Sequence, residues 1–159
     1  MNLYRFSPIQ NEEQLREAIA YVATQTSALS KKVIGDSLPV ASLTIFAHYS
    51  SEYEAVRAML SSLGQETAAS NGIRIQLQKP VVVGSNQITH VRIRKPDPYR
   101  MQVGCADLIV PDYSVFKSEY LQIHVGNLRL IERSEYEMIE FFHPDFDVLA
   151  YVVSDKLHI

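Results

Sequence analysis

The sequence has one cysteine, Cys105, and no tryptophan among its 159 residues. A single cysteine excludes an internal disulfide and any zinc site built from several cysteines. No segment approaches the roughly 18 consecutive apolar residues of a membrane-spanning helix, so we expect no membrane association. The first residues also lack a basic stretch followed by an apolar run, the pattern of a signal peptide. These absences together favour the cytoplasm.

The motifs of several large enzyme classes are missing as well. There is no glycine-rich phosphate loop, no GxSxG nucleophile elbow and no HExxH zinc motif. The net charge is −3, from 15 Lys and Arg against 18 Asp and Glu, whereas a nucleic-acid surface usually carries a basic balance. We therefore expect no nucleic-acid partner. Hydrophobic residues make up 47% and charged residues 21% of the chain, which is ordinary for a globular domain.

Helix and strand patterns alternate along the chain. Apolar residues at helical spacing predict one or two helices over residues 12–34, with Asn11 as the N-cap. Ser51 and Glu54 form a capping-box pattern at the start of a second helix, and a third, short helix is expected over residues 113–121. The predicted strands cover residues 40–49, 73–78, 81–83, 88–95, 104–110, 128–133, 136–142 and 148–153.

This order of elements repeats once. A strand is followed by a helix and then by further strands in residues 39–98, and the same order recurs in residues 99–159. A helix that covers one face of such a sheet leaves the other face free. We therefore predict an α+β fold in one domain, residues 1–159. It consists of an N-terminal helical segment, residues 1–38, and two βαβββ-like modules that form a curved mixed sheet or open barrel.

Three short passages carry a family pattern. They are Ser51-Glu52-Tyr53-Glu54 with Leu63-Gly64, Asn71-Gly72-Ile73-Arg74-Ile75 with Pro80-Val81, and Ile93-Arg94-Lys95-Pro96-Asp97-Pro98 with Gly104 and Val110-Pro111-Asp112. They resemble the vicinal oxygen chelate superfamily, the glyoxalase and bleomycin-resistance type, in its branch with an N-terminal helical extension. The resemblance spans roughly residues 40–155. It implies paired βαβββ modules with a concave functional face, and one divalent metal ligated by His and Glu side chains.

The metal-ligand positions of that family are altered here. The first-strand His position falls at or near Ser42, the Glu position falls at Arg94, and the corresponding "EH" of the second module falls at Ala106-Asp107. An arginine repels a cation and has no lone pair to donate. We therefore predict that the usual metal site is lost and that the protein uses no cofactor.

The segment 88–95 alternates with period 2, so His90, Arg92 and Arg94 share one face of the predicted strand. Arginine presents a planar fork of donors that binds a carboxylate or phosphate bidentately. We interpret the protein as a small-molecule-binding protein whose concave sheet face holds an anionic ligand without the usual metal. The expected ligand-binding residues are Arg74, Arg92, Arg94, Asp107 and Tyr136. His90 is the candidate acid/base residue, together with Glu140.

Other interpretations of the same residues stay open. The polar face can simply be solvated and hold cross-strand ion pairs. A relocated divalent-metal site built from His48, His90 and Glu140 would make the protein a lyase, isomerase or dioxygenase-like enzyme. An exposed sheet edge or the N-terminal helix can serve as a protein-interaction module, and a homodimer is a further option.

Overall fold

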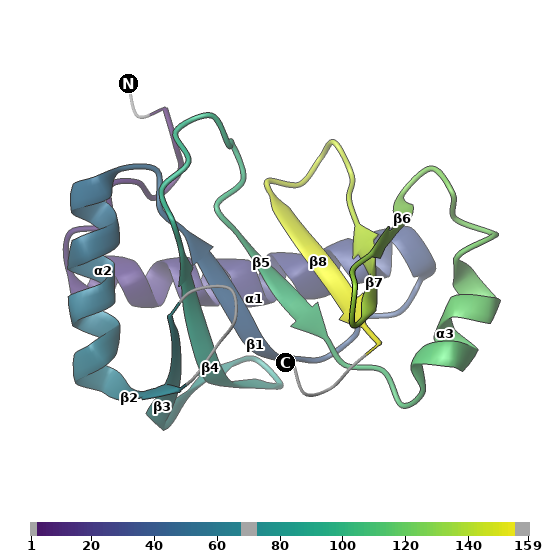
Figure 1. Ribbon diagram of the computed structural model, residues 1–159, viewed down its shortest axis with the longest axis horizontal. Helices are drawn as coiled ribbons and strands as arrows, with labels where there is room; N and C mark the ends of the chain where they lie inside the picture. The colour runs from purple at the N-terminus through teal and green to yellow at the C-terminus, as the bar shows by residue number, and fades with distance from the viewer. Residues whose placement is uncertain (1–2, 68–72, 155–159) are drawn as a thin grey trace.

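The computed structural model describes residues 3–67 and 73–154, and these form one mixed sheet of eight strands with three helices (Figure 1). The elements are α1 (Glu12–Ile34), β1 (Val40–Phe46), α2 (Ser50–Leu63), β2 (Gly64–Thr67), β3 (Arg74–Val83), β4 (Asn86–Arg94), β5 (Gly104–Leu108), α3 (Tyr113–Tyr120), β6 (Leu128–Glu132), β7 (Glu137–Phe141) and β8 (Val148–Val153). Asn71 and Gly72, which belong to one of the passages that resemble the family, lie outside the described residues.

The sheet consists of two halves that share a topology. The strand order is β2-β3-β4-β1-β5-β8-β7-β6. In each half the leading strand pairs in parallel with the last strand, β1 with β4 and β5 with β8. At the centre of the sheet β1 and β5 pair antiparallel and join the halves. Each half is therefore a strand, a helix and three strands, which confirms the predicted α+β fold with two βαβββ modules.

Residues 12–34 form a single helix rather than two. The side chain of Asn11 caps it by accepting a hydrogen bond from the Gln14 backbone N–H, and Gly35 ends it with a φ of 86°, a conformation that favours glycine. Its apolar stripe, which includes Leu15 and Val22, is fully buried. In Figure 1, α1 passes behind the central strands, where it packs on β1, β5 and β8.

Two local predictions in the first module are wrong. Pro80 does not divide the strand it interrupts, because β3 runs from Arg74 to Val83 and takes up the irregularity as a register shift between Gln76 and Val81. The strand that completes the module is instead β2, which starts directly at Gly64 and pairs with β3. Its sequence, Gly-Gln-Glu-Thr, is polar because β2 is an edge strand of the sheet.

The start of α2 also differs from the prediction. The helix begins at Ser50 with Tyr49 as its N-cap, and no side chain makes a capping hydrogen bond there. β1 ends at Phe46 instead of extending to residue 49. The chain then turns inward, so that His48 is buried away from the sheet face that its strand parity would have given it.

The two faces of the sheet have different chemistry. On one face of the sheet, alternate residues of the strands are apolar and lie buried beneath α1 and α2, as with Leu43, Val91 and Ala106. The opposite parity, which includes Arg92 and Asp107, faces away from these helices and lines hollows. No helix among the described residues is long and apolar enough to cross a membrane.

Candidate functional site

Two adjoining hollows lie on the side of the sheet opposite α1 and α2, and the second of them is also bordered by α3. The central hollow measures about 760 Å³. It is lined by Ser42 and Thr44 of β1, Arg92 and Arg94 of β4, Cys105 and Asp107 of β5, and by residues of β6 to β8. The side hollow measures about 1010 Å³ and includes His90 and Arg74. Ser42, Tyr136 and Val153 border both. The predicted concave face is therefore a continuous open depression.

Strand register fixes the order of side chains across this face. Ser42 of β1 pairs with His90 of β4 on one side and with Asp107 of β5 on the other. Asp107 in turn pairs with Tyr151 of β8, and Tyr151 pairs with Glu140 of β7. Because paired residues of adjacent strands point to the same face, a row of polar groups crosses the centre of the sheet.

A second row of side chains on the same face lies two residues away from the first along the strands, and it begins with two arginines. Arg74 of β3 and Arg92 of β4 are direct cross-strand partners, and both are half-buried. In the described part of the chain, neither makes a hydrogen bond or an ion pair within 4 Å. Burial and the charge of Arg92 both lower the pKa of Arg74. Like charges placed directly opposite are destabilising, so this pair favours a bound anion.

Arg94 has a different environment. Its guanidinium lies over the Phe46 ring, 4.9 Å from the ring centroid. The stacking leaves the edge of the guanidinium plane, which carries the donors, directed away from the ring. Arg94 therefore lines the central hollow with its position set by Phe46.

Asp107 is the carboxylate at the middle of the face. Burial raises its pKa from 3.8 to about 6, and the charges of Arg92 and then Arg74 oppose that rise. Residues 3–67 and 73–154 provide it with neither a hydrogen bond nor an ion pair within 4 Å. Asp107 thus interacts with the arginines through space without direct contact, and a gap separates the opposite charges.

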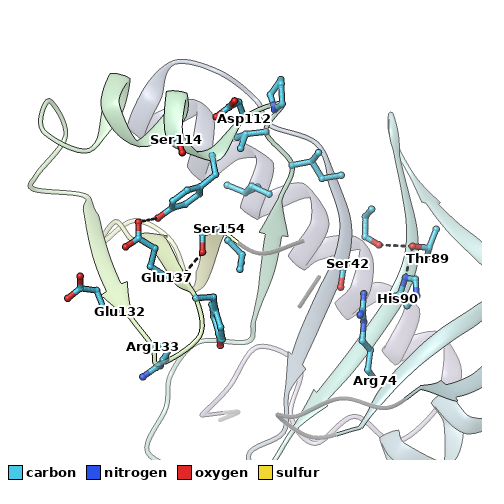
Figure 2. A pocket seen from close by; sticks show the side chains of 18 residues that line it. Ser42, Arg74, Thr89, His90, Asp112, Ser114, Glu132, Arg133, Glu137 and Ser154 are labelled. Carbon is cyan, nitrogen blue, oxygen red and sulfur yellow. Dashed lines mark hydrogen bonds between the residues drawn. The ribbon is translucent and has the colours of Figure 1, made fainter. Parts of the chain in front are cut away.

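His90 borders the side hollow next to this gap. Its Nδ1 shares a hydrogen bond of 2.8 Å with the Thr89 hydroxyl, and burial followed by the nearby Arg74 charge lowers its pKa below 6.5. The imidazole is therefore mostly neutral at pH 7. Figure 2 shows His90, Ser42 and Arg74 together on one side of the side hollow, with Glu137 on the other.

Glu140, the other predicted acid/base residue, lies elsewhere. Three strands separate β7 from β4 in the sheet order, which corresponds to about 19 Å at a strand spacing of about 4.8 Å. The Glu140 side chain is 6% exposed; its Oε1 accepts a hydrogen bond of 2.5 Å from Arg129, and its Oε2 accepts one of 2.8 Å from Tyr151. Glu140 is therefore paired within the protein and does not act together with His90.

The alternative metal ligands are not brought together. His48 follows the far end of β1, shares a hydrogen bond of 2.6 Å with Ser7 and stacks on Tyr4. His90, by contrast, pairs with Ser42 near the start of β1. Within the residues that the structure describes, no three His, Cys, Asp or Glu side chains form a group able to hold a metal ion.

His48 instead belongs to a buried junction between the N-terminal segment and α2. The Glu52 side chain, in a residue only 2% exposed, accepts hydrogen bonds from the backbone N–H of Ile9 (2.6 Å) and of His48 (2.7 Å). These charge-assisted bonds tie the segment before α1 to the sheet. Glu52 was not among the predicted site residues, and the sequence signal that marks it is an acidic residue on the same helix face as the apolar Val56 and Leu60.

Tyr136, a predicted ligand-binding residue, stands just before β7 and borders both hollows. Its neighbour Glu137 accepts hydrogen bonds from the Tyr113 hydroxyl (3.0 Å) and from the Lys117 ammonium (2.6 Å), and these attachments join α3 to β7. Tyr151 was not among the predicted site residues, although it is the only polar residue among the six of β8 and lines the central hollow. Alternation along that strand would have placed it on the hollow.

Comparison with known proteins supports the fold and assigns no function. No family model matches the chain, and no curated protein sequence matches it. A solved structure titled "Structural Genomics, Protein EC4020" is similar, with a TM-score of 0.63 and 12% sequence identity. The alignment covers 96% of this chain and 93% of that one. At this identity the likeness shows a shared fold, and the family resemblance noted in the sequence stays a prediction.

Proposed function

We propose that this protein binds a small anionic molecule, a carboxylate or phosphate, in the central hollow at its border with the side hollow, through Arg92 of the central hollow and Arg74 of the side hollow. The observation that carries the proposal is the half-buried arginine pair that faces the depression without a direct anionic partner among the described side chains. Two guanidinium groups provide several donors for one oxyanion. Arg94, positioned on Phe46, lines the same hollow and adds to the positive field.

The overall charge of the protein makes this concentration of arginine informative. The chain carries a net charge of −3, yet the strands at the floor of the hollow present Arg92, Arg94 and the adjoining Arg74. Among the described strand residues that line the central hollow, Asp107 is the carboxylate without a direct partner. A purely solvated face would place such cations where water screens them. The half-burial of the pair supports ligand binding over simple solvation.

Thermal unfolding in the presence of phosphate, acetate, succinate and citrate tests this proposal. A ligand at ten times its Kd adds about 1.4 kcal/mol to the free energy of unfolding. For a chain of this length that raises Tm by about 3–6 °C. Arg92→Gln should abolish the shift. Arg57→Gln, which removes an exposed charge from α2, should retain it. Equal shifts for both variants, or none for any anion, would overturn the proposal.

A further inference from the structure

We propose that the ligand of the central hollow is a zwitterion, an α-amino acid or aminophosphonate. Its anionic group binds Arg92 and Arg74, and its ammonium group binds the Asp107 carboxylate. This inference rests on the proposed function, because it takes the arginine pair as the anion site.

Asp107 and Glu140 are carboxylates that the strands contribute to the floor of the central hollow, and their hydrogen bonding differs. Both oxygens of Glu140 accept hydrogen bonds, one from Arg129 and one from Tyr151. Asp107 receives none in the part of the chain that the structure describes. A carboxylate withdrawn from water without a hydrogen-bonded partner is costly. A cationic group of a ligand would therefore stabilise the Asp107 carboxylate more than it would stabilise Glu140.

The spacing of the strands leaves room for such a ligand. Arg92 pairs with Thr44 of β1, and Asp107 pairs with Ser42 of the same strand. The two charged residues therefore flank β1, and their strands lie about 10 Å apart. Both side chains line the central hollow, one from each side of β1. The interval between their charged ends exceeds ion-pair distance, so a ligand with charges of both signs can bridge it.

The floor under that interval is also polar. Ser42 and Thr44 present hydroxyl groups from β1 between the two flanking strands. A hydroxyl can donate to a carboxylate and accept from an ammonium, so both ends of a zwitterion find partners there. A simple anion would leave Asp107 uncompensated and close to its own negative charge. Asp107 consequently disfavours simple anions and favours those that carry an adjacent amine.

Matched pairs of compounds test the inference directly. Each pair holds the anionic group constant and differs in the amine: L-alanine with propionate, L-glutamate with glutarate, and aminomethylphosphonate with methylphosphonate. Calorimetric titration at pH 7.5 should give at least tenfold tighter binding for the amine-bearing member of one or more pairs. Asp107→Asn should reduce that ratio to about one and strengthen binding of the member without the amine. Glu54→Gln, an exposed change on α2, should leave the ratio unchanged.

The outcomes separate this inference from the proposed function. If the compounds bind but no amine-bearing member of the three pairs binds more tightly than its amine-free partner, the zwitterion inference fails while the anion site stands. If Asp107→Asn, shown to be folded by circular dichroism, retains the amine preference, the assigned role of Asp107 is wrong. If no compound of any pair binds, neither the inference nor the proposed function survives.

Discussion

Replacing Asp107 by Asn should stabilise the unliganded protein at neutral pH. Burial raises the pKa of this carboxyl from 3.8 to about 6, so the fold disfavours its ionised form. A rise of that size corresponds to about 3 kcal/mol. Because the side chain is half-buried and borders an open hollow, solvent screening reduces the expected gain to about 1–2 kcal/mol. Asn keeps the shape and removes the charge.

The sign of the pH dependence follows from the raised pKa. Between about pH 4 and pH 6 the folded protein holds a proton on Asp107 that the unfolded chain has released, so this residue's contribution to stability falls as pH rises through that window. Well below pH 4 the carboxyl is protonated in both states and resembles Asn. The advantage of Asp107→Asn should thus be small at pH 4 and complete at pH 7.5.

Other ionisable groups near Asp107 do not mimic this effect. Burial raises the pKa of Cys105 to about 12 and raises that of Tyr151, so neither group titrates between pH 4 and pH 8. His90 has a lowered pKa, and the variant His90→Gln separates its contribution.

Urea unfolding monitored by far-UV circular dichroism, at half-unit steps from pH 4 to pH 8, gives the free energy of unfolding of the wild type and of Asp107→Asn. The chain has no tryptophan, so backbone signal is the suitable probe. The difference between wild type and Asp107→Asn cancels the titrations common to both. If the variant is less stable at pH 7.5, Asp107 is a structural ion-pair partner of the arginines, and the reasoning about an uncompensated carboxylate is refuted.

Two further predictions concern the framework around the hollow. Glu52→Ala removes the acceptor of two buried backbone N–H groups and should lower the free energy of unfolding by about 3 kcal/mol, whereas Glu54→Ala on the exposed face should change it by less than about 0.5 kcal/mol. Gly104→Ala would place a Cβ 2.5 Å from the Thr44 carbonyl oxygen and 2.8 Å from Val22. It should cost about 2–3 kcal/mol, and a stability equal to wild type in urea titration would show that α1 and the sheet pack less tightly than described.

The sequence predicted the repeat of modules because alternation and helical spacing survive in each element separately. The strands of the second module lie within the ranges expected for them, and in β5 the buried residues Gly104, Ala106 and Leu108 alternate with Cys105 and Asp107, which line the hollow. The edge strand β2 was missed because an edge strand is largely exposed and needs little apolar surface. The break predicted at Pro80 was wrong because proline cannot donate a ladder hydrogen bond, and β3 accommodates this with a register shift between Gln76 and Val81.

The alternation of side chains along a strand predicted which site residues share a face of the sheet. Arg74, Arg92, Arg94 and Asp107 line the hollows as alternation required. Parity says nothing about how far apart two residues of one face lie, so the separation of His90 from Glu140 depended on the strand order. The placement of His48 on the concave face was wrong for another reason, because the strand that would have oriented it ends two residues earlier. Its burial results from tertiary contacts with the N-terminal segment.

The most direct test of the central claim is the location of a bound oxyanion. Crystals soaked in selenate, a tetrahedral oxyanion with a strong anomalous signal, should show selenium between the guanidinium groups of Arg74 and Arg92. The same soak of Arg92→Gln crystals should show no peak there. Selenium confined to lattice contacts or to exposed lysines in the wild-type protein would contradict the account.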